Sequence, residues 1–92
     1  MTSDDDSQVL RRFFSAEGRL LDMPTRHAKR RLVLDHVAQR FEPGRRYDWR
    51  TVDALLKEVY DDHAALRRYL VDDGFLSREG DVYWRSGGSV DF

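Results

Sequence analysis

The chain has 92 residues, which suits one domain, because a chain of this length buries too little surface to divide it between two hydrophobic cores. It contains no cysteine, which excludes thiolate catalysis, iron–sulfur clusters and zinc–thiolate sites, and which suits a reducing cytoplasm. No apolar run approaches the roughly 18 residues of a membrane span, and the acidic run Asp4–Asp6 does not suit the basic start of a signal peptide. We therefore expect a cytoplasmic protein that does not enter a membrane.

The net charge of −1 at pH 7 conceals a segregation of charge along the chain. Counted by segment, the charge is −2 for residues 1–24, +5 for residues 25–46 and −4 for residues 47–92. The middle segment is electropositive, so an anionic partner is to be sought there first.

The N-terminal part of the chain predicts one short helix. Residues 1–7 are polar and acidic and are expected to be disordered, with Ser7 as the N-cap of the helix that follows. Gly18 is expected to end this helix. Apolar residues recur at three- and four-residue spacing on one of its faces, namely Val9, Leu10, Phe13 and Phe14.

The longest predicted helix covers about residues 26–40, with Thr25 as its N-cap and a stop at residues 42–44. Its apolar stripe consists of Leu34, Val37, Ala38 and Phe41, with Val33 beside it. We expect this stripe to face the core.

Two further helices are predicted next, joined by a short break at residues 60–62. The first is capped by Asp48 and runs to about Val59, and the second covers about His63–Asp72, with Gly74 after its end. The residues expected to face inward are Val52, Leu55, Leu56 and Val59 on the first, and Ala65, Leu66, Tyr69 and Leu70 on the second. Two helices joined by such a turn are typical of a helix-turn-helix.

A β-hairpin is predicted after the helices, from residues 75–78 and 82–85 around the turn Glu79-Gly80-Asp81, with Trp84 in the core. The expected fold class is therefore mainly α with a small β-hairpin (α+β). The order of elements predicts a winged helix-turn-helix-like domain with an extra N-terminal helix over residues 8–85. Residues 86–92 are rich in Gly and Ser and are expected to form a flexible tail.

Several separated motifs occur in an order that is similar to one known family. They are Gly18-Arg19-Leu20, the stretch 24–31 with its Lys29-Arg30, the stretches 41–47 and 66–72, and Tyr83-Trp84-Arg85. Between about Phe13 and Arg85 the chain thus resembles the bacterial domain of unknown function 2087. Members of this family look like proteins that stand alone or are attached at the C-terminus of helix-turn-helix transcription regulators. The resemblance therefore implies a role in gene regulation, and it supplies no catalytic residue for this chain. One departure is that Trp49 and Arg50 stand where the family tends to have a polar cap followed by an acidic residue.

The residues predict neither a metal site nor catalysis. His27 and His36 lie nine residues apart on one predicted helix, about 180° apart around its axis, so they cannot share an ion. His63 lies at a helix start beside acids that suit capping. The sequence has no nucleophile elbow, no glycine-rich phosphate loop and no facing pair of carboxylates. We expect a protein that is not an enzyme and that needs no cofactor.

The basic cluster Arg26, Lys29 and Arg30 lies in the first turns of a predicted helix, where the helix dipole disfavours cations. Asp72 and Asp73 are acids at the end of another helix, which is also unfavourable. The two sets could lie together and neutralise each other. Alternatively, the cluster could bind a phosphate or a carboxylate.

Two functions from different classes remain open. In the first, the protein is a winged-helix regulatory module associated with transcription, with helix 63–72 in the major groove of DNA and the hairpin on the backbone. Against it, Asp62, Asp72 and Asp73 would repel a duplex. In the second, it is a protein-binding or dimerisation module that uses the first helix and the aromatic hairpin, without DNA contact. The sequence favours the regulatory module, and the candidate anion- or nucleic-acid-binding residues are Arg26, Lys29, Arg30, Arg45, Arg67, Arg68 and Arg85.

Overall fold

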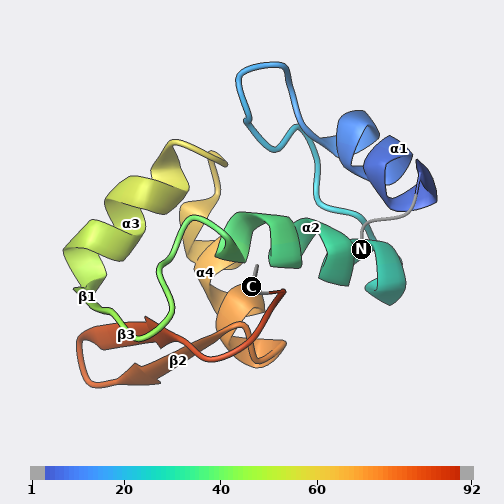
Figure 1. Ribbon diagram of the computed structural model, residues 1–92. Coiled ribbons are helices and arrows are strands. Elements are labelled where there is room, and N and C mark those ends of the chain that lie inside the picture. The colour runs from blue at the N-terminus through green and yellow to red at the C-terminus, as the bar shows by residue number, and fades with distance from the viewer. Residues whose placement is uncertain (1–3, 90–92) are drawn as a thin grey trace.

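The computed structural model describes the backbone of residues 4–89 and the side chains of residues 8–89. The elements in this part of the chain are α1 (Asp4–Phe13), α2 (His27–Ala38), β1 (Arg46–Asp48), α3 (Trp49–Lys57), α4 (His63–Asp72), β2 (Leu76–Glu79) and β3 (Val82–Arg85). Figure 1 shows α2 in the middle of the molecule, with α1 on one side and α3, α4 and the sheet on the other. The predicted α+β class is confirmed. No helix in this part of the chain is long and apolar enough to cross a membrane.

The first helix begins earlier than the sequence predicted. It starts at Asp4, so Ser7 lies within the helix instead of capping it, and the prediction of disorder is wrong for residues 4–7, which are helical. Acidic residues in a first turn interact favourably with the positive end of the helix dipole, which explains the extension. The same expectation for residues 1–3 lies outside the described residues. After α1, Phe14 and Leu20 form an isolated antiparallel bridge that returns the chain toward α2.

The second helix is shorter than predicted but buries the predicted stripe. Arg26 is its N-cap residue, in an extended conformation and without a side-chain capping bond, so Thr25 is not the cap. The stripe residues Leu34, Val37, Ala38 and Phe41 are all buried, and so is Val33 beside them. Burial of this face, and not a capping bond, therefore holds α2 in place.

The third helix begins as predicted. The carboxylate of Asp48 accepts a hydrogen bond from the backbone N–H of Thr51 at 2.8 Å, which satisfies one of the unpaired donors of the first turn. This bond is also the main reason why the pKa of the Asp48 carboxyl is lowered. The helix ends at Lys57, two residues before the predicted end at Val59.

The fourth helix matches its predicted bounds, and Asp62 caps it by accepting a hydrogen bond from the backbone N–H of Ala65 at 3.2 Å. The predicted core residues of α3, α4 and the segment between them are buried, namely Val52, Leu56, Val59, Leu66 and Leu70. Leu55 and Tyr69, also expected to face inward, are only partly buried at the edge of this core.

The sheet has a third strand that the sequence did not reveal. The predicted hairpin is present as β2 and β3, and β1 pairs antiparallel with β3, so the strand order is β1-β3-β2. Three residues are too few to show the period-two alternation of a strand, and the pairing joins segments far apart in the chain. Gly80 has a φ of 60° at the first of the two residues between the strands, which fits a tight hairpin turn.

The prediction that Trp84 lies in the core is wrong. Tyr83 is the buried residue of β3, and its partner across β1 is Tyr47, which is also buried. Trp84 pairs with Arg46 and Ser77 on the opposite face of the sheet, where the guanidinium of Arg46 lies 4.7 Å from its ring. Successive residues of a strand point to opposite faces, so only one of the two adjacent aromatics could enter the core.

The predicted flexible tail is folded back onto the domain as far as Ser89. The backbone N–H groups of Ser86 and Gly87 donate to the carbonyl oxygen of Phe75, at 3.0 and 3.3 Å. A Cβ on Gly87 would lie 2.5 Å from the carbonyl oxygen of Gly74, so this close approach requires glycine. The tail prediction therefore fails for residues 86–89, because the composition that suggested flexibility is what permits the close packing. Residues 90–92 lie outside the described part.

Candidate functional site

The three basic residues at the start of α2 differ in their surroundings. Arg26 is exposed and Lys29 is partly exposed. The side chain of Arg30 is 22% exposed, and its guanidinium carbon lies 5.0 Å from the centre of the Tyr69 ring on α4. Arg30 thus takes part in the packing of α2 against α4.

Asp73 follows α4 and lies against the same end of α2. Its carboxylate oxygens are 3.9 Å from Nε of Arg30 and 3.9 Å from Nε2 of His27. The Nη1 group of Arg31 donates to the backbone carbonyl oxygen of Asp73 at 3.1 Å. Arg30 and Asp73 are therefore neighbours, as the first of the two sequence explanations predicted, whereas Arg26 and Lys29 make no ion pair with either acid within residues 8–89. Asp72 is exposed and makes no ion pair with the basic cluster within residues 8–89.

Arg85 and Arg45, two further candidates, are not near this cluster in any described contact. The Nε and Nη1 groups of Arg85 donate to the carbonyl oxygens of Gly87 and Phe41 at 3.0 and 3.2 Å, and Nη2 donates to the carbonyl oxygen of Ser89. Each nitrogen of its guanidinium is thus engaged by the backbone, which gives Arg85 a structural task. Arg45 is exposed, with its guanidinium carbon 4.9 Å from the ring centre of Tyr47.

The remaining candidates, Arg67 and Arg68, line a cleft between α4 and the β2–β3 hairpin. The cleft has a volume of about 280 Å³ and is lined by Ala64, Arg67, Arg68, Val71 and Asp72 of α4, Arg78 of β2 and Tyr83 of β3. Three of these seven residues are arginines and one is an acid. We refer to this space as the arginine cleft.

The arginines of the arginine cleft are held in different ways. Arg67 forms an ion pair with Asp53 of α3, in which Nη1 donates to the carboxylate. The Nε group of Arg78 donates to the carbonyl oxygen of Gly80 at 2.8 Å, and its guanidinium carbon lies 5.7 Å from the ring centre of Tyr83. Arg68 is exposed and makes no ion pair or hydrogen bond within residues 8–89. The cleft therefore combines two oriented guanidinium groups with a third that is available.

Arg78 and Tyr83 were missed by the sequence reasoning. The signal for them was the alternation of the hairpin, because Arg78 lies two residues after the buried Leu76 and is the cross-strand partner of Tyr83. The prediction that Trp84 is the core residue of β3 assigned Tyr83 to the opposite face of the sheet, so the pairing of Tyr83 with Arg78 on the core side was not expected.

His27 and His36 have different neighbours in the fold. His27 faces Asp73, whereas the ring of His36 lies 4.7 Å from that of Phe14 on the α1 side of α2. Partial removal from water by this packing lowers the pKa of His36, and Arg40 lowers it further. Among the described residues, no group of three or more His, Asp or Glu side chains is placed to hold a metal ion.

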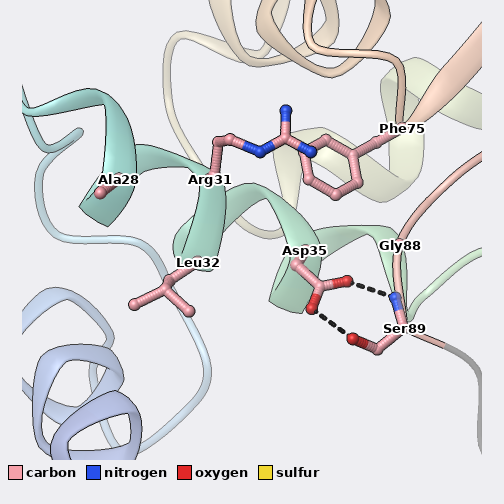
Figure 2. A pocket seen from close by; sticks show the side chains of 7 residues that line it. All are labelled: Ala28, Arg31, Leu32, Asp35, Phe75, Gly88 and Ser89. Carbon is pink, nitrogen blue, oxygen red and sulfur yellow. Dashed lines mark hydrogen bonds between the residues drawn. The ribbon is translucent and has the colours of Figure 1, made fainter.

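A second, more open cavity of about 320 Å³ lies where the tail crosses α2 (Figure 2). There the carboxylate of Asp35 accepts hydrogen bonds from the backbone N–H and the hydroxyl of Ser89, at 2.7 and 2.8 Å. The guanidinium of Arg31 lies against the ring of Phe75, 4.8 Å from its centre. The charged groups of this cavity are thus occupied by contacts within the protein, which leaves the arginine cleft as the better candidate.

The fold and the cleft define a small α+β domain with a basic recess between a helix and a β-hairpin. The chain belongs to the bacterial family described as uncharacterized protein conserved in bacteria (DUF2087), whose family model matches residues 19–85. The matched segment runs through β3 and includes every residue that lines the arginine cleft, whereas α1 lies outside it. No curated protein and no solved structure matches the chain.

Proposed function

We propose that the protein is a non-enzymatic winged-helix regulatory module that binds duplex nucleic acid, with α4 as the recognition helix and the β2–β3 hairpin as the wing. The order α2, β1, α3, α4, β2, β3 supports this proposal, because two helices joined by a short turn and followed by a β-hairpin are the elements of a winged helix-turn-helix. In helix-turn-helix proteins the second helix of the pair enters the major groove.

The observation that carries the proposal is that two of the acidic residues next to α4 have partners within the protein. Asp62 caps the helix and Asp73 lies against the guanidinium of Arg30 on α2, so both negative charges are partly compensated within the molecule. Asp72 is the one acid of α4 that is exposed, beside the exposed Arg68. The repulsion that the sequence suggested between this helix and a duplex is correspondingly smaller.

A protein-binding or dimerisation module is the second candidate. Glu79 and Asp81 are exposed at the tip of the hairpin, where a wing would meet phosphate groups. Leu21 is 64% exposed and Trp49 is 42% exposed, which are features of protein interfaces. These observations favour a protein partner or a second copy of the chain.

The test is the affinity for a mixed-sequence DNA duplex at a series of salt concentrations. If α4 contacts the duplex, affinity falls as salt rises, and Arg68→Gln reduces the slope of log affinity against log salt by about 0.9, because one phosphate contact is lost. Arg12→Gln on α1 removes the same charge from an exposed position and serves as the matched control.

Absence of duplex binding at low salt would contradict the proposal. A concentration-dependent dimer in sedimentation experiments, together with that absence, would favour the second candidate. An equal loss of slope in Arg12→Gln and Arg68→Gln would show general attraction to the polyanion without a role for α4.

A further inference from the structure

We infer that the arginine cleft is a binding site for one phosphodiester group, held by Arg68, Arg78 and the hydroxyl of Tyr83. The inference rests on the proposed function, because the phosphodiester would come from a nucleic-acid backbone. It adds which side chains would bind that group. Of these three residues, the sequence pointed only to Arg68.

Tyr83 gives the cleft its most specific donor. Only 3% of this residue is exposed, and it is one of the residues that line the cleft, so the part of it that remains accessible faces the cleft. Its hydroxyl makes no hydrogen bond with any other residue of the described part of the chain. The hydroxyl oxygen is not one of the fully buried polar atoms without a partner in this part of the chain, so it remains accessible to water at the cleft and can donate to a ligand there. An oxygen of a phosphate in the cleft would replace water as the acceptor of this hydrogen bond.

Arg78 is positioned before any ligand arrives. Its Nε group is fixed by the carbonyl oxygen of Gly80, and its guanidinium lies beside the ring of Tyr83. Its two Nη groups make no hydrogen bond within residues 8–89. A guanidinium that is already oriented loses less conformational entropy when it binds a phosphate than a mobile one does.

The charge of the cleft indicates which kind of phosphate it suits. Arg67, Arg68 and Arg78 supply three positive charges, of which the ion pair with Asp53 compensates one and the neighbouring Asp72 compensates another. One positive charge remains, which matches the single negative charge of a phosphodiester. A phosphate monoester carries close to two negative charges at pH 7 and would leave one of them beside Asp72 uncompensated.

The experiment combines duplex binding with thermal unfolding in the presence of diethyl phosphate, a monoanionic phosphodiester that is not a nucleic acid. Tyr83→Phe is expected to weaken duplex binding about three- to tenfold, because one hydrogen bond is lost. It should leave the salt slope unchanged, since no charge is removed. Arg78→Gln is expected to reduce the slope by about 0.9. Diethyl phosphate should raise the melting temperature of the wild type and of Arg12→Gln, but not of Tyr83→Phe or Arg78→Gln.

Asp72→Asn supplies a test of opposite sign. Removal of this carboxylate should strengthen binding of both the duplex and diethyl phosphate, and should let inorganic phosphate stabilise the protein as well. Because the hydroxyl of Tyr83 makes no bond inside the described fold, Tyr83→Phe should melt within about 2 °C of the wild type without ligand. A loss of binding at unchanged stability would therefore reflect the site and not the fold.

The outcomes separate the two proposals. Duplex binding that depends on Arg68 but not on Tyr83 or Arg78 would overturn the phosphodiester site and leave the proposed function standing. Stabilisation by diethyl phosphate that depends on Tyr83, without any duplex binding, would support the site and overturn the proposed function. Neither response in the wild type would overturn both.

Discussion

The start of α2 and the arginine cleft are both rich in cations, and they differ in what surrounds those cations. At the start of α2, Arg30 faces the ring of Tyr69 and the carboxylate of Asp73, so its charge takes part in joining two helices. In the cleft, Arg68 and two nitrogens of Arg78 have no partner within the described residues. The cleft lies in the part of the sequence with a net charge of −4, whereas α2 belongs to the part with +5. A count of charge along a sequence therefore does not locate the cations that remain available after folding.

The largest expected effect on stability concerns α4, the helix that contributes to both regions. Leu66 is fully buried on α4, the helix that carries both Tyr69, which contacts Arg30 of α2, and residues of the arginine cleft. Leu66→Ala is expected to lower the free energy of unfolding by about 2–5 kcal/mol, measured by denaturant titration, because it removes buried volume. An unchanged midpoint would show that α4 presents a different face to the core.

The next effect tests whether the start of α2 is a structural contact. Asp73→Asn removes the carboxylate that faces Arg30, whose Nε is buried without a hydrogen bond, and should cost about 1–2 kcal/mol. Asp72→Asn, the exposed neighbour, should change stability by less than about 0.5 kcal/mol. Equal effects in the two variants would mean that the contact between Arg30 and Asp73 does not stabilise the fold.

A smaller effect decides which region binds anions. At ten times its Kd, diethyl phosphate should stabilise the wild type by about 1.4 kcal/mol. The double change Arg26→Gln and Lys29→Gln should keep this gain, because both residues lie outside the cleft. If the gain disappears in the double variant, the anion site lies at the start of α2, as the second explanation of the basic cluster predicted.

The smallest effect concerns a residue on the other side of α2. The pKa of His36 in the folded protein lies below its usual value of 6.5, so the unfolded chain takes up the proton first as pH falls. Stability should therefore decrease as pH falls through about 6.5 and below, until both states are protonated. His36→Gln should remove this part of the pH dependence, as measured by thermal unfolding from pH 7.5 to pH 5. The difference between the two proteins should be the same with and without diethyl phosphate, since His36 packs against Phe14 and does not line the cleft.

Much of the helical framework was predictable because it depends on neighbours in sequence. The apolar period of α2, the caps Asp48 and Asp62, and the glycine after α4 each act within one or two helical turns. The bounds of α4 and the stripe of α2 followed directly from these signals. The start of α1 did not, because a serine cap and an acidic first turn are both acceptable beginnings of a helix.

The candidate site was only partly predictable for a related reason. Arg67 and Arg68 stand out on a predicted helix, but their pairing with Asp53 and with the cleft depends on how α3, α4 and the hairpin pack. Arg85, a candidate because of its charge, donates to three backbone carbonyl groups, which belong to Phe41 and to the folded-back segment 86–89. The structural role of Arg85 could not be predicted from the sequence, because two of its acceptors belong to residues 86–89, whose position depends on the tertiary structure.

The sequence by itself determined the class of fold, the helices α2 to α4 and the hairpin, because periodicity and capping are local properties of the chain. Tertiary structure alone decided that β1 joins the sheet, that Tyr83 and not Trp84 enters the core, and that residues 86–89 pack against α2 and Phe75. It also decided which arginines remain available for a ligand. These features depend on contacts between residues far apart in sequence. Which partner a charged group or an aromatic ring contacts is decided by how the helices and strands pack.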